Sequence, residues 1–250
     1  MSPKLCILGQ DTLAKAVLEC CQRHFCASPV IYREADMIWI CHDTPIAAGG
    51  EPDAEWVIVQ IRQALTDWAA LDNPAVTHPL ILISSQMPVG TIARLEKEYP
   101  GHTFACSPEN LRVATAVADF ENQARVVIGT RNDNHKGLLD AVFAPFTKQI
   151  IWTTPETAEM VKHTLNCFLG LQIAFINEIA RVCGDVKADA NVVSEALLSE
   201  RRISPNAPLK PGKPFGGGHL MRDIMALEDF VKGRGISIPI ISHIRESNGS

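Results

Sequence analysis

The stretch PFGGGHLMRD, residues 214–223, combines a flexible backbone with side chains that could take part in chemistry. Gly216, Gly217 and Gly218 would let a ligand approach the main chain closely, because glycine has no Cβ atom and readily adopts positive φ values. His219 follows directly, and a neutral imidazole is a possible general base with a pKa in the physiological range. The alternative, that His219 is an ordinary polar loop residue, stays open.

A carboxylate and a lysine–asparagine pair are the other candidates for chemistry. Glu109, in CSPENLR, follows a predicted strand, where it could act as a general base or orient a water molecule. The same position also suits an acidic residue in the first turn of a helix. Lys162 and Asn166 are spaced i, i+4 and therefore share one helix face. They could stabilise an oxyanion there. Alternatively, they form the exposed stripe of a core helix.

Residues 9–14, GQDTLA, lie where a dinucleotide-binding turn would lie, between an apolar strand and an amphipathic helix. Gly9 and Ala14 fit the pattern G-x-G-x-x-G/A, whereas Asp11 replaces the glycine that lets a pyrophosphate approach the backbone. Such sites carry a ribose-binding acid about 20 residues after the turn, and this count reaches Glu34. The turn therefore indicates either an NAD site or a related scaffold that has lost its cofactor.

Short apolar runs alternate with amphipathic stretches, which predicts a parallel sheet covered by helices. After Thr154 the pattern becomes helical, and a last helix is expected from about residue 220 to 233, followed by a disordered tail at 245–250. The expected fold class is α/β: a Rossmann-like parallel sheet domain over 1–152, then an all-helical dimerisation domain over 153–245. Strands are expected within 4–9, 35–45, 79–86, 102–109 and 124–130, and helices within 12–25, 53–70, 89–100, 155–184 and 189–199.

Composition excludes several classes of function. The formal net charge of −5 gives no electrostatic support for nucleic-acid binding. We expect no membrane span, because no apolar run approaches the roughly 20 residues that a span needs. The eight cysteines lack metal-ligand spacing, which favours small buried thiols in a reducing cytoplasm and no metal site.

Several motifs occur together, in one order, along nearly the whole chain. They resemble the signatures of the nucleotide-sugar 6-dehydrogenases, the UDP-glucose/GDP-mannose dehydrogenase family. That family oxidises the C6 alcohol of a nucleotide sugar to a carboxylate with two NAD, through a thioester on a cysteine, and forms dimers through its helical region. The resemblance thus implies NAD, a nucleotide-sugar ligand, a homodimer and a role in polysaccharide biosynthesis. The motifs are ADMIWICHDTP, ISSQMPVGT, SPENLRVATAVADFENQARVVIG, AEMVKHTLNCFLGLQIAFINE and FGGGHLMRD.

The resemblance also implies roles for individual residues. Glu109 matches an acid/base glutamate, Lys162 and Asn166 match the pair that stabilises the oxyanion, and Asp223 matches the aspartate that supports the nucleophile and water. The implied cofactor-binding residues are Gly9, Asp11, Ala14, Thr44, Pro45 and Gln86. The implied substrate-binding residues are Leu111, Phe215, Gly216, Gly217, Gly218 and Arg222.

The departures from the family pattern leave two hypotheses. His219 occupies the position of the nucleophilic cysteine, and Arg222 replaces a lysine. The segment between the first helix and ADMIWI is short, and the family's C-terminal nucleotide-binding domain is expected to be absent. The chain is either an enzyme that oxidises a sugar nucleotide or related alcohol, with His219 in place of cysteine, or a catalytically inactive homologue that serves as a binding or regulatory subunit.

Overall fold

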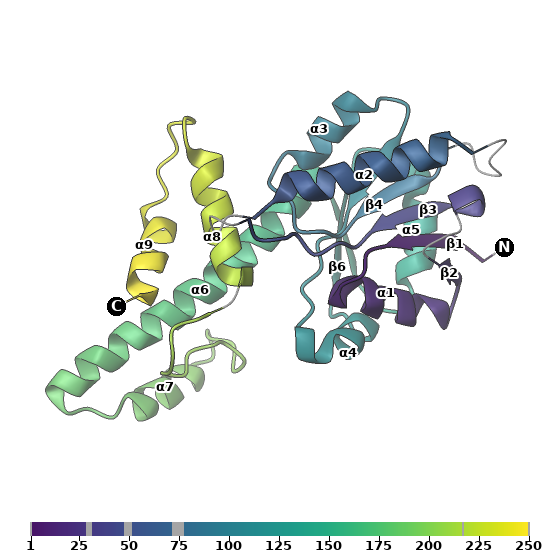
Figure 1. Ribbon diagram of the computed structural model, residues 1–250. Coiled ribbons are helices and arrows are strands. Elements are labelled where there is room, and N and C mark those ends of the chain that lie inside the picture. The colour runs from purple at the N-terminus through teal and green to yellow at the C-terminus, as the bar shows by residue number, and fades with distance from the viewer. Residues whose placement is uncertain (1, 29–31, 48–51, 72–77, 217, 250) are drawn as a thin grey trace. The chain divides into compact units, whose positions relative to one another are not determined.

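The computed structural model describes residues 2–28, 32–47, 52–71, 78–216 and 218–249, and the chain divides into two compact units, 1–162 and 163–250. In the described part of the first unit, the strands form one sheet in the order β2-β1-β3-β4-β5-β6-β7 (Figure 1). Neighbouring strands are parallel except β5 and β6, which are antiparallel. The strands are β1 (Lys4–Leu8), β2 (Cys26–Ser28), β3 (Met37–Ile40), β4 (Leu80–Ile83), β5 (Thr103–Cys106), β6 (Val126–Thr130) and β7 (Ile150–Thr153).

Helices cover both faces of this sheet (Figure 1). On one face, α1 (Thr12–Gln22), α4 (Ala116–Glu121) and α5 (Lys136–Phe143) bury their apolar sides over residues such as Ile7 and Trp39. On the other face, α2 (Ala54–Ala69) and α3 (Thr91–Glu98) pack over Ile38 and Ile81. Strands β3 and β4, MIWI and LILI, are buried at every position, as expected of parallel strands covered on both faces.

The long helix α6 (Pro155–Val186) begins in the first unit and continues through the second. Its start at Pro155 follows from the sequence, because proline lacks the N–H that a first helical turn leaves unpaired. The second unit also contains α7 (Ala190–Leu198), α8 (Gly218–Val231) and α9 (Pro239–Asn248). The expected α/β architecture with a helical second part is therefore confirmed.

Three details of the sequence prediction were wrong. The sheet is not wholly parallel, and it includes β2 and β7, which were not predicted. The tail at 245–250 is not disordered over its described part, because α9 continues to Asn248. The side chain of Asn248 accepts a hydrogen bond from the Phe215 N–H (2.8 Å) and donates one to the Phe215 carbonyl (3.1 Å), which ties the end of the helix to the rest of the unit.

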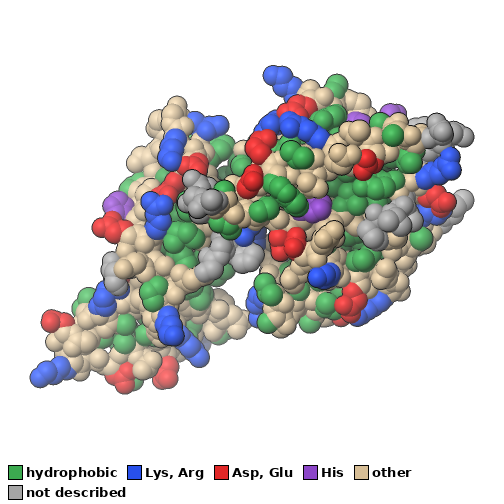
Figure 2. Space-filling view, viewed as in Figure 1, with side chains coloured by type: hydrophobic (Ala, Val, Ile, Leu, Met, Phe, Trp, Pro, Cys, Tyr) green, Lys and Arg blue, Asp and Glu red, His purple; other side chains and the backbone are tan. Residues whose placement is uncertain are grey.

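Helix α6 is also the one helix in the described ranges that is long and apolar enough to cross a membrane, judged by length and composition only. This finding differs from the expectation that no apolar run approaches the roughly 20 residues of a membrane span. A core helix of a soluble protein passes the same test, and α6 carries the buried polar residues His163 and Asn166, both bonded to Asp223. On the face of the molecule seen in Figure 2, acidic and basic side chains are interspersed, as the modest net charge leads one to expect.

Candidate functional site

The turn between β1 and α1 has the backbone that a dinucleotide site requires. Gly9 has a φ of +144°, and a Cβ atom there would lie 2.6 Å from both the Cβ of Ala14 and the carbonyl oxygen of Cys41. No other residue type fits such a position, and the small side chain of Ala14 lets α1 come close to the strands. Gly9 and Ala14 therefore lie together as the sequence pattern predicts.

Asp11 changes the charge of this turn. It is the N-cap residue of α1, it is exposed, and its carboxylate accepts a hydrogen bond of 3.3 Å from the backbone N–H of Asp43, just after β3. The N-terminus of a helix normally attracts a phosphate, because its N–H groups and dipole favour negative charge. The backbone of the turn thus fits NAD, whereas the carboxylate of Asp11 opposes the charge of its diphosphate.

Glu34 does not serve as a ribose-binding acid. Its carboxylate lies 2.5 Å from Nζ of Lys4, the residue that begins β1. Glu34 is thus at the amino end of the strands, whereas ligands of open α/β sheets bind at the carboxyl end. The count from the turn fails because β2 has only three residues and a single turn of 3₁₀ helix, Tyr32–Glu34, follows in place of a full helix.

The loops after β3 and β4 are joined by a side-chain hydrogen bond. Thr44 is buried, and its hydroxyl donates to the carbonyl oxygen of Gln86 over 2.5 Å. The carbonyl oxygen of Pro45 accepts a hydrogen bond of 2.8 Å from the N–H of Asp53 and so holds the start of α2. These contacts place Thr44, Pro45 and Gln86 at the carboxyl edge of the sheet, where the family resemblance expects a cofactor.

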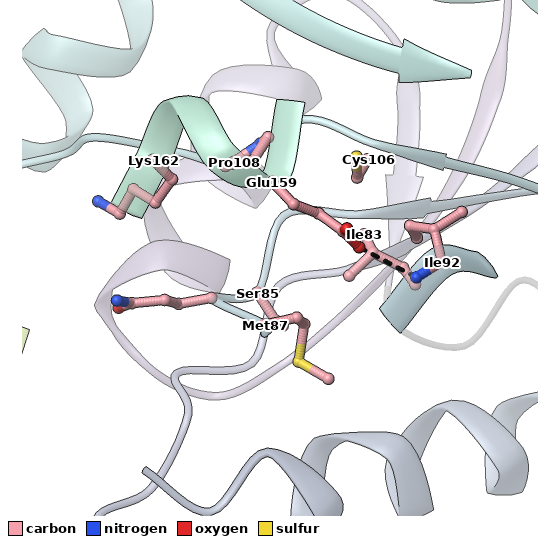
Figure 3. Close-up of a pocket in the computed structure, with 9 residues that line it drawn as sticks. Ile83, Ser85, Met87, Ile92, Cys106, Pro108, Glu159 and Lys162 are labelled. Atoms are coloured by element: carbon pink, nitrogen blue, oxygen red, sulfur yellow. Dashed lines mark hydrogen bonds between the residues drawn. The ribbon is translucent and has the colours of Figure 1, made fainter. Parts of the chain in front are cut away.

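A small pocket opens beside these loops, at the carboxyl ends of β4 and β5 (Figure 3). Among the described residues, the Ser85 hydroxyl and the Nε2 of Gln86 are buried without a hydrogen-bond partner. Glu159 of α6 accepts hydrogen bonds from the N–H groups of Gly90 (2.6 Å) and Ile92 (3.0 Å), and Lys162 extends away from it along the same helix. The lining residues are Ile83, Ser85, Gln86, Met87, Ile92, Cys106, Pro108, Glu159 and Lys162.

Glu109 has the properties of an acid/base group. Its side chain is buried, only 8% exposed, and its Oε1 has no hydrogen-bond partner among the described residues. Burial raises the pKa of the Glu109 carboxyl to about 8, although the ammonium group of Lys162 acts to lower it. Lys162 in turn donates a hydrogen bond of 3.1 Å to Oδ1 of Asn110. A carboxyl that exchanges its proton near neutral pH thus lies close to an anchored cation.

In the second unit, Asp223 is the centre of a buried polar cluster. Its side chain is fully buried, one carboxylate oxygen accepts a hydrogen bond from the Asn166 amide, and the other lies 2.5 Å from Nδ1 of His163. The structure therefore brings Asn166 and Asp223 together. Arg222 beside them is also buried.

The glycine loop connects Phe215 to the start of α8. Phe215 is fixed by Asn248, Gly216 has open space where a Cβ would be, and Gly218 begins α8. Gly217 lies outside the described residues, and so do the side-chain surroundings of His219 in the first turn of α8. Leu111, in the first unit, is partly buried against the apolar core under α1 and α4.

Comparison with known protein families identifies the family of this chain. The NAD binding domain of the UDP-glucose/GDP-mannose dehydrogenase family matches residues 7–147, and its central domain matches residues 156–250. The chain belongs to the UDP-glucose/GDP-mannose dehydrogenase family. The family resemblance drawn from the motifs is thereby confirmed, and the NAD-binding domain supports NAD as the cofactor.

Individual members of the dehydrogenase family show the extent of the match. UDP-glucose 6-dehydrogenase TuaD of Bacillus subtilis (strain 168) is 30% identical over 227 residues, which cover 88% of this chain and 48% of TuaD. A UDP-glucose dehydrogenase structure from Pyrobaculum islandicum gives a TM-score of 0.79 at 26% identity, covering 91% of this chain and 54% of that one. The chain spans about half the length of the curated relatives it matches.

A solved structure outside this family shares the fold. The 3-hydroxyisobutyrate dehydrogenase of Mycobacterium tuberculosis gives a TM-score of 0.73 at 17% identity, covering 100% of this chain and 93% of that one. At this identity the likeness shows the fold alone. A sheet unit followed by a helical unit therefore also occurs as nearly the whole chain of another dehydrogenase.

Three residues at these sites were not predicted from the sequence. Asn110 directly follows Glu109 and holds Lys162, and Glu159 is one helical turn before Lys162 and caps α3. Their closeness to predicted residues in the chain was the signal that could have found them. His163 likewise follows Lys162 directly, but its contact with Asp223 left no sequence signal, since 60 residues separate the two.

Proposed function

We propose that the chain binds NAD and a nucleotide sugar and oxidises an alcohol of that sugar, with Glu109 and Lys162 as catalytic residues. The observation that carries the proposal is the Glu109 carboxyl: it is buried, its Oε1 has no partner among the described residues, and burial raises its pKa to about 8 beside Lys162. Perturbed carboxyls of this kind are typical of acid/base sites. Family membership supports the reaction class and the substrate class of the proposal.

Different residues of the first unit would have different roles in an alcohol oxidation. Gly9, Ala14, Thr44 and Gln86 would hold NAD, which supplies the hydride acceptor when it is bound. In its ionised form Glu109 would take the hydroxyl proton of the substrate. Lys162, held by Asn110, would stabilise the negative charge that develops on the oxygen.

A second candidate function is that of a catalytically inactive binding or regulatory subunit. Two features favour it: Asp11 brings a carboxylate to the N-terminus of α1, and the motif resemblance puts His219 at the position of the family's nucleophilic cysteine. Such a subunit would retain sugar-nucleotide binding and would release no NADH. Both candidates share the ligand class and differ in turnover.

The test is to incubate the protein with NAD and a panel of UDP- and GDP-sugars, follow NADH by absorbance and identify products by mass spectrometry. We expect NADH with one sugar nucleotide, a rate that rises with pH through about 8, and loss of the rate in Glu109→Gln. Glu195→Gln, an exposed acid on α7, is the control and should leave the rate unchanged. Tight sugar-nucleotide binding without NADH would support the regulatory subunit instead.

A homodimer joined through α6 belongs to the same proposal. Phe168, Phe175 and Val182 are 54%, 46% and 59% exposed and follow one another at seven-residue spacing, which puts them along one side of the helix. Apolar side chains that repeat in this way along one helix form a stripe that a second copy of the helix could cover. Light scattering that gives a monomer at high protein concentration would contradict this assignment.

We also place the protein in the cytoplasm, as a supplier of oxidised sugar nucleotides for polysaccharide biosynthesis. The eight cysteines all lie in the described ranges and none of them is part of a disulfide there, which suits a reducing compartment. Measurement of the cellular pool of oxidised sugar nucleotides after loss of the protein would test this role.

A further inference from the structure

A chain of buried hydrogen bonds joins the ends of β3, β4 and β5 and reaches Ser107, two residues before the proposed acid/base group Glu109. Trp39 in β3 is fully buried, and its indole Nε1–H donates to the hydroxyl of Ser84 over 2.8 Å. The Ser84 hydroxyl, just after β4, donates to the carbonyl oxygen of Ser107 over 2.6 Å. Ser107 directly follows β5 and is 1% exposed, so the whole chain is shielded from water.

The direction of this chain is fixed by chemistry. An indole N–H can only donate and a backbone carbonyl can only accept, whereas a serine hydroxyl does both. Ser84 is therefore the one side chain in the series that connects Trp39 to Ser107. The backbone N–H of Ser84 also donates to the carbonyl of Ile40 (2.9 Å), which holds Ser84 itself at the end of the sheet.

The end of the chain lies two residues before Glu109. Both backbone polar groups of Ser107 are engaged, the carbonyl by Ser84 and the N–H by the carbonyl of Ile83 at 3.0 Å. Pro108 follows, and its ring fixes its own φ angle. The backbone before Glu109 therefore has little conformational freedom, which fixes the position from which the Glu109 side chain extends into its buried site.

We propose that Ser84 is a positioning residue that keeps the Glu109 carboxyl in its buried place by fixing the Ser107–Pro108 backbone. The inference rests on the proposed function only for the role of Glu109. Without the Ser84 hydroxyl, the Ser107 carbonyl and the Trp39 N–H would both be buried without a partner, which is costly enough to move the loop. A moved loop would expose the Glu109 carboxyl to water.

The charged and titratable groups around Glu109 bear on how its titration is read. Lys162 on α6 faces it and lowers its pKa, and the thiols of Cys21 on α1 and Cys41 after β3 interact with it electrostatically. Burial raises the pKa of the Cys21 and Cys41 thiols above their ordinary value, so both stay neutral while Glu109 titrates. A change in the titration of Glu109 in a Ser84 variant therefore reports on its hydration and on its distance from Lys162.

The experiment is an NMR pH titration of ¹³C-carboxyl-labelled glutamates in the ligand-free protein, with the Glu109 signal assigned by its loss in Glu109→Gln. We expect Ser84→Ala to raise the proton dissociation constant of Glu109 by roughly tenfold or more, that is, to lower its pKa from about 8 by about one unit. The ¹⁵N indole signal of Trp39, assigned with Trp39→Phe, should shift and lose protection from hydrogen exchange in the same variant.

Controls separate positioning from mere loss of stability. Ser85→Ala removes a neighbouring hydroxyl that has no partner among the described residues, and Leu139→Ala opens a cavity in the core under α5; neither should move the Glu109 titration. Ser84→Thr keeps the hydroxyl, so Glu109 in this variant should titrate as it does in the natural protein. If Ser84→Ala does not fold, Ser84→Cys should give an intermediate shift, because a thiol is a weak donor.

An unchanged Glu109 titration in Ser84→Ala or Ser84→Cys, with the Trp39 signal altered, would overturn the proposal. A shift of the same size in Leu139→Ala would also overturn it, because general destabilisation would then explain the effect. The titration needs no substrate, so absence of turnover would count against the proposed function and not against Ser84.

Discussion

Replacement of Asp11 should strengthen NAD binding. Asp11 is at the N-cap position of α1 but its side chain makes no capping hydrogen bond to the helix, and its carboxylate is held beside the loop after β3 by the N–H of Asp43. In the NAD-binding turn this is the point at which the backbone approaches the diphosphate. The Asp11→Gly variant removes both the side-chain bulk and the negative charge, while Gly9 and Ala14 keep the turn in place.

The size of the effect follows from the exposure of Asp11. Two like charges about 4 Å apart repel by about 1 kcal/mol in water and by about 4 kcal/mol near a protein surface. Because Asp11 is exposed, the lower part of this range applies, about 1–2 kcal/mol, or roughly 5- to 30-fold in the dissociation constant. The helix should tolerate the change, since glycine at an N-cap costs only a few tenths of a kcal/mol.

Calorimetric titration with NAD at two salt concentrations is the assay. Asp11→Asn keeps the size of the side chain and removes its charge, so it should show most of the gain if repulsion dominates. Added salt should improve binding to the natural protein more than to Asp11→Asn, because screening weakens the repulsion. Asp189→Asn, at the N-cap of α7, is the matched control. Low-micromolar NAD affinity in the natural protein, or no gain in either Asp11 variant, would refute the reasoning.

Three further predictions concern pH, product and assembly. The pKa of Glu109 is about 8 in the folded protein and about 4.3 in the unfolded chain, so the free energy of unfolding should fall as pH rises between these two values. The total decrease should be on the order of 5 kcal/mol. Denaturant titrations of Glu109→Gln should lack this pH dependence. The motif resemblance puts His219 at the position of the family's nucleophilic cysteine, so mass spectrometry should find no UDP-glucuronate from UDP-glucose and NAD, and at most a slow oxidation to the aldehyde. His219→Cys should gain the acid if the rest of the site is intact, and stoichiometric UDP-glucuronate from the natural protein would contradict the prediction. Phe175→Glu should raise the dissociation constant of the proposed homodimer at least tenfold in sedimentation experiments, by placing a charge in the apolar stripe of α6, while an unchanged constant would put the interface elsewhere.

The elements that the sequence predicts well are those with a strong local signal. MIWI and LILI are unbroken apolar runs, and such runs indicate strands buried on both faces. The start of α6 is marked by Pro155 and the start of α7 by Asp189, whose side chain accepts hydrogen bonds from Asn191 and Val192. These features depend on neighbours within one or two turns, which is what a sequence pattern records.

What the sequence did not predict depends on distant partners. The β6 strand reads like the others, but its direction is set by how the chain returns to the sheet, and an apolar run carries no direction. The three residues of β2 are too few for a pattern, and they form a strand because β1 offers a parallel edge. The contact of His163 with Asp223 likewise arises only when α6 and α8 pack together.

The carboxyl edge of the sheet carries two kinds of buried polar group, and the difference bears on whether this unit is a working site. Thr44, Ser84 and Ser107 have their hydrogen-bonding groups paired with neighbouring loops. By contrast, the Ser85 hydroxyl and Oε1 of Glu109 are buried without a partner among the described residues. An unpaired buried polar group costs about 1–3 kcal/mol. A unit that served only as a scaffold could replace these side chains with apolar ones and gain stability. Their presence beside fully paired neighbours therefore favours a bound ligand as the missing partner, as both candidate functions require, over a unit that serves only as a scaffold.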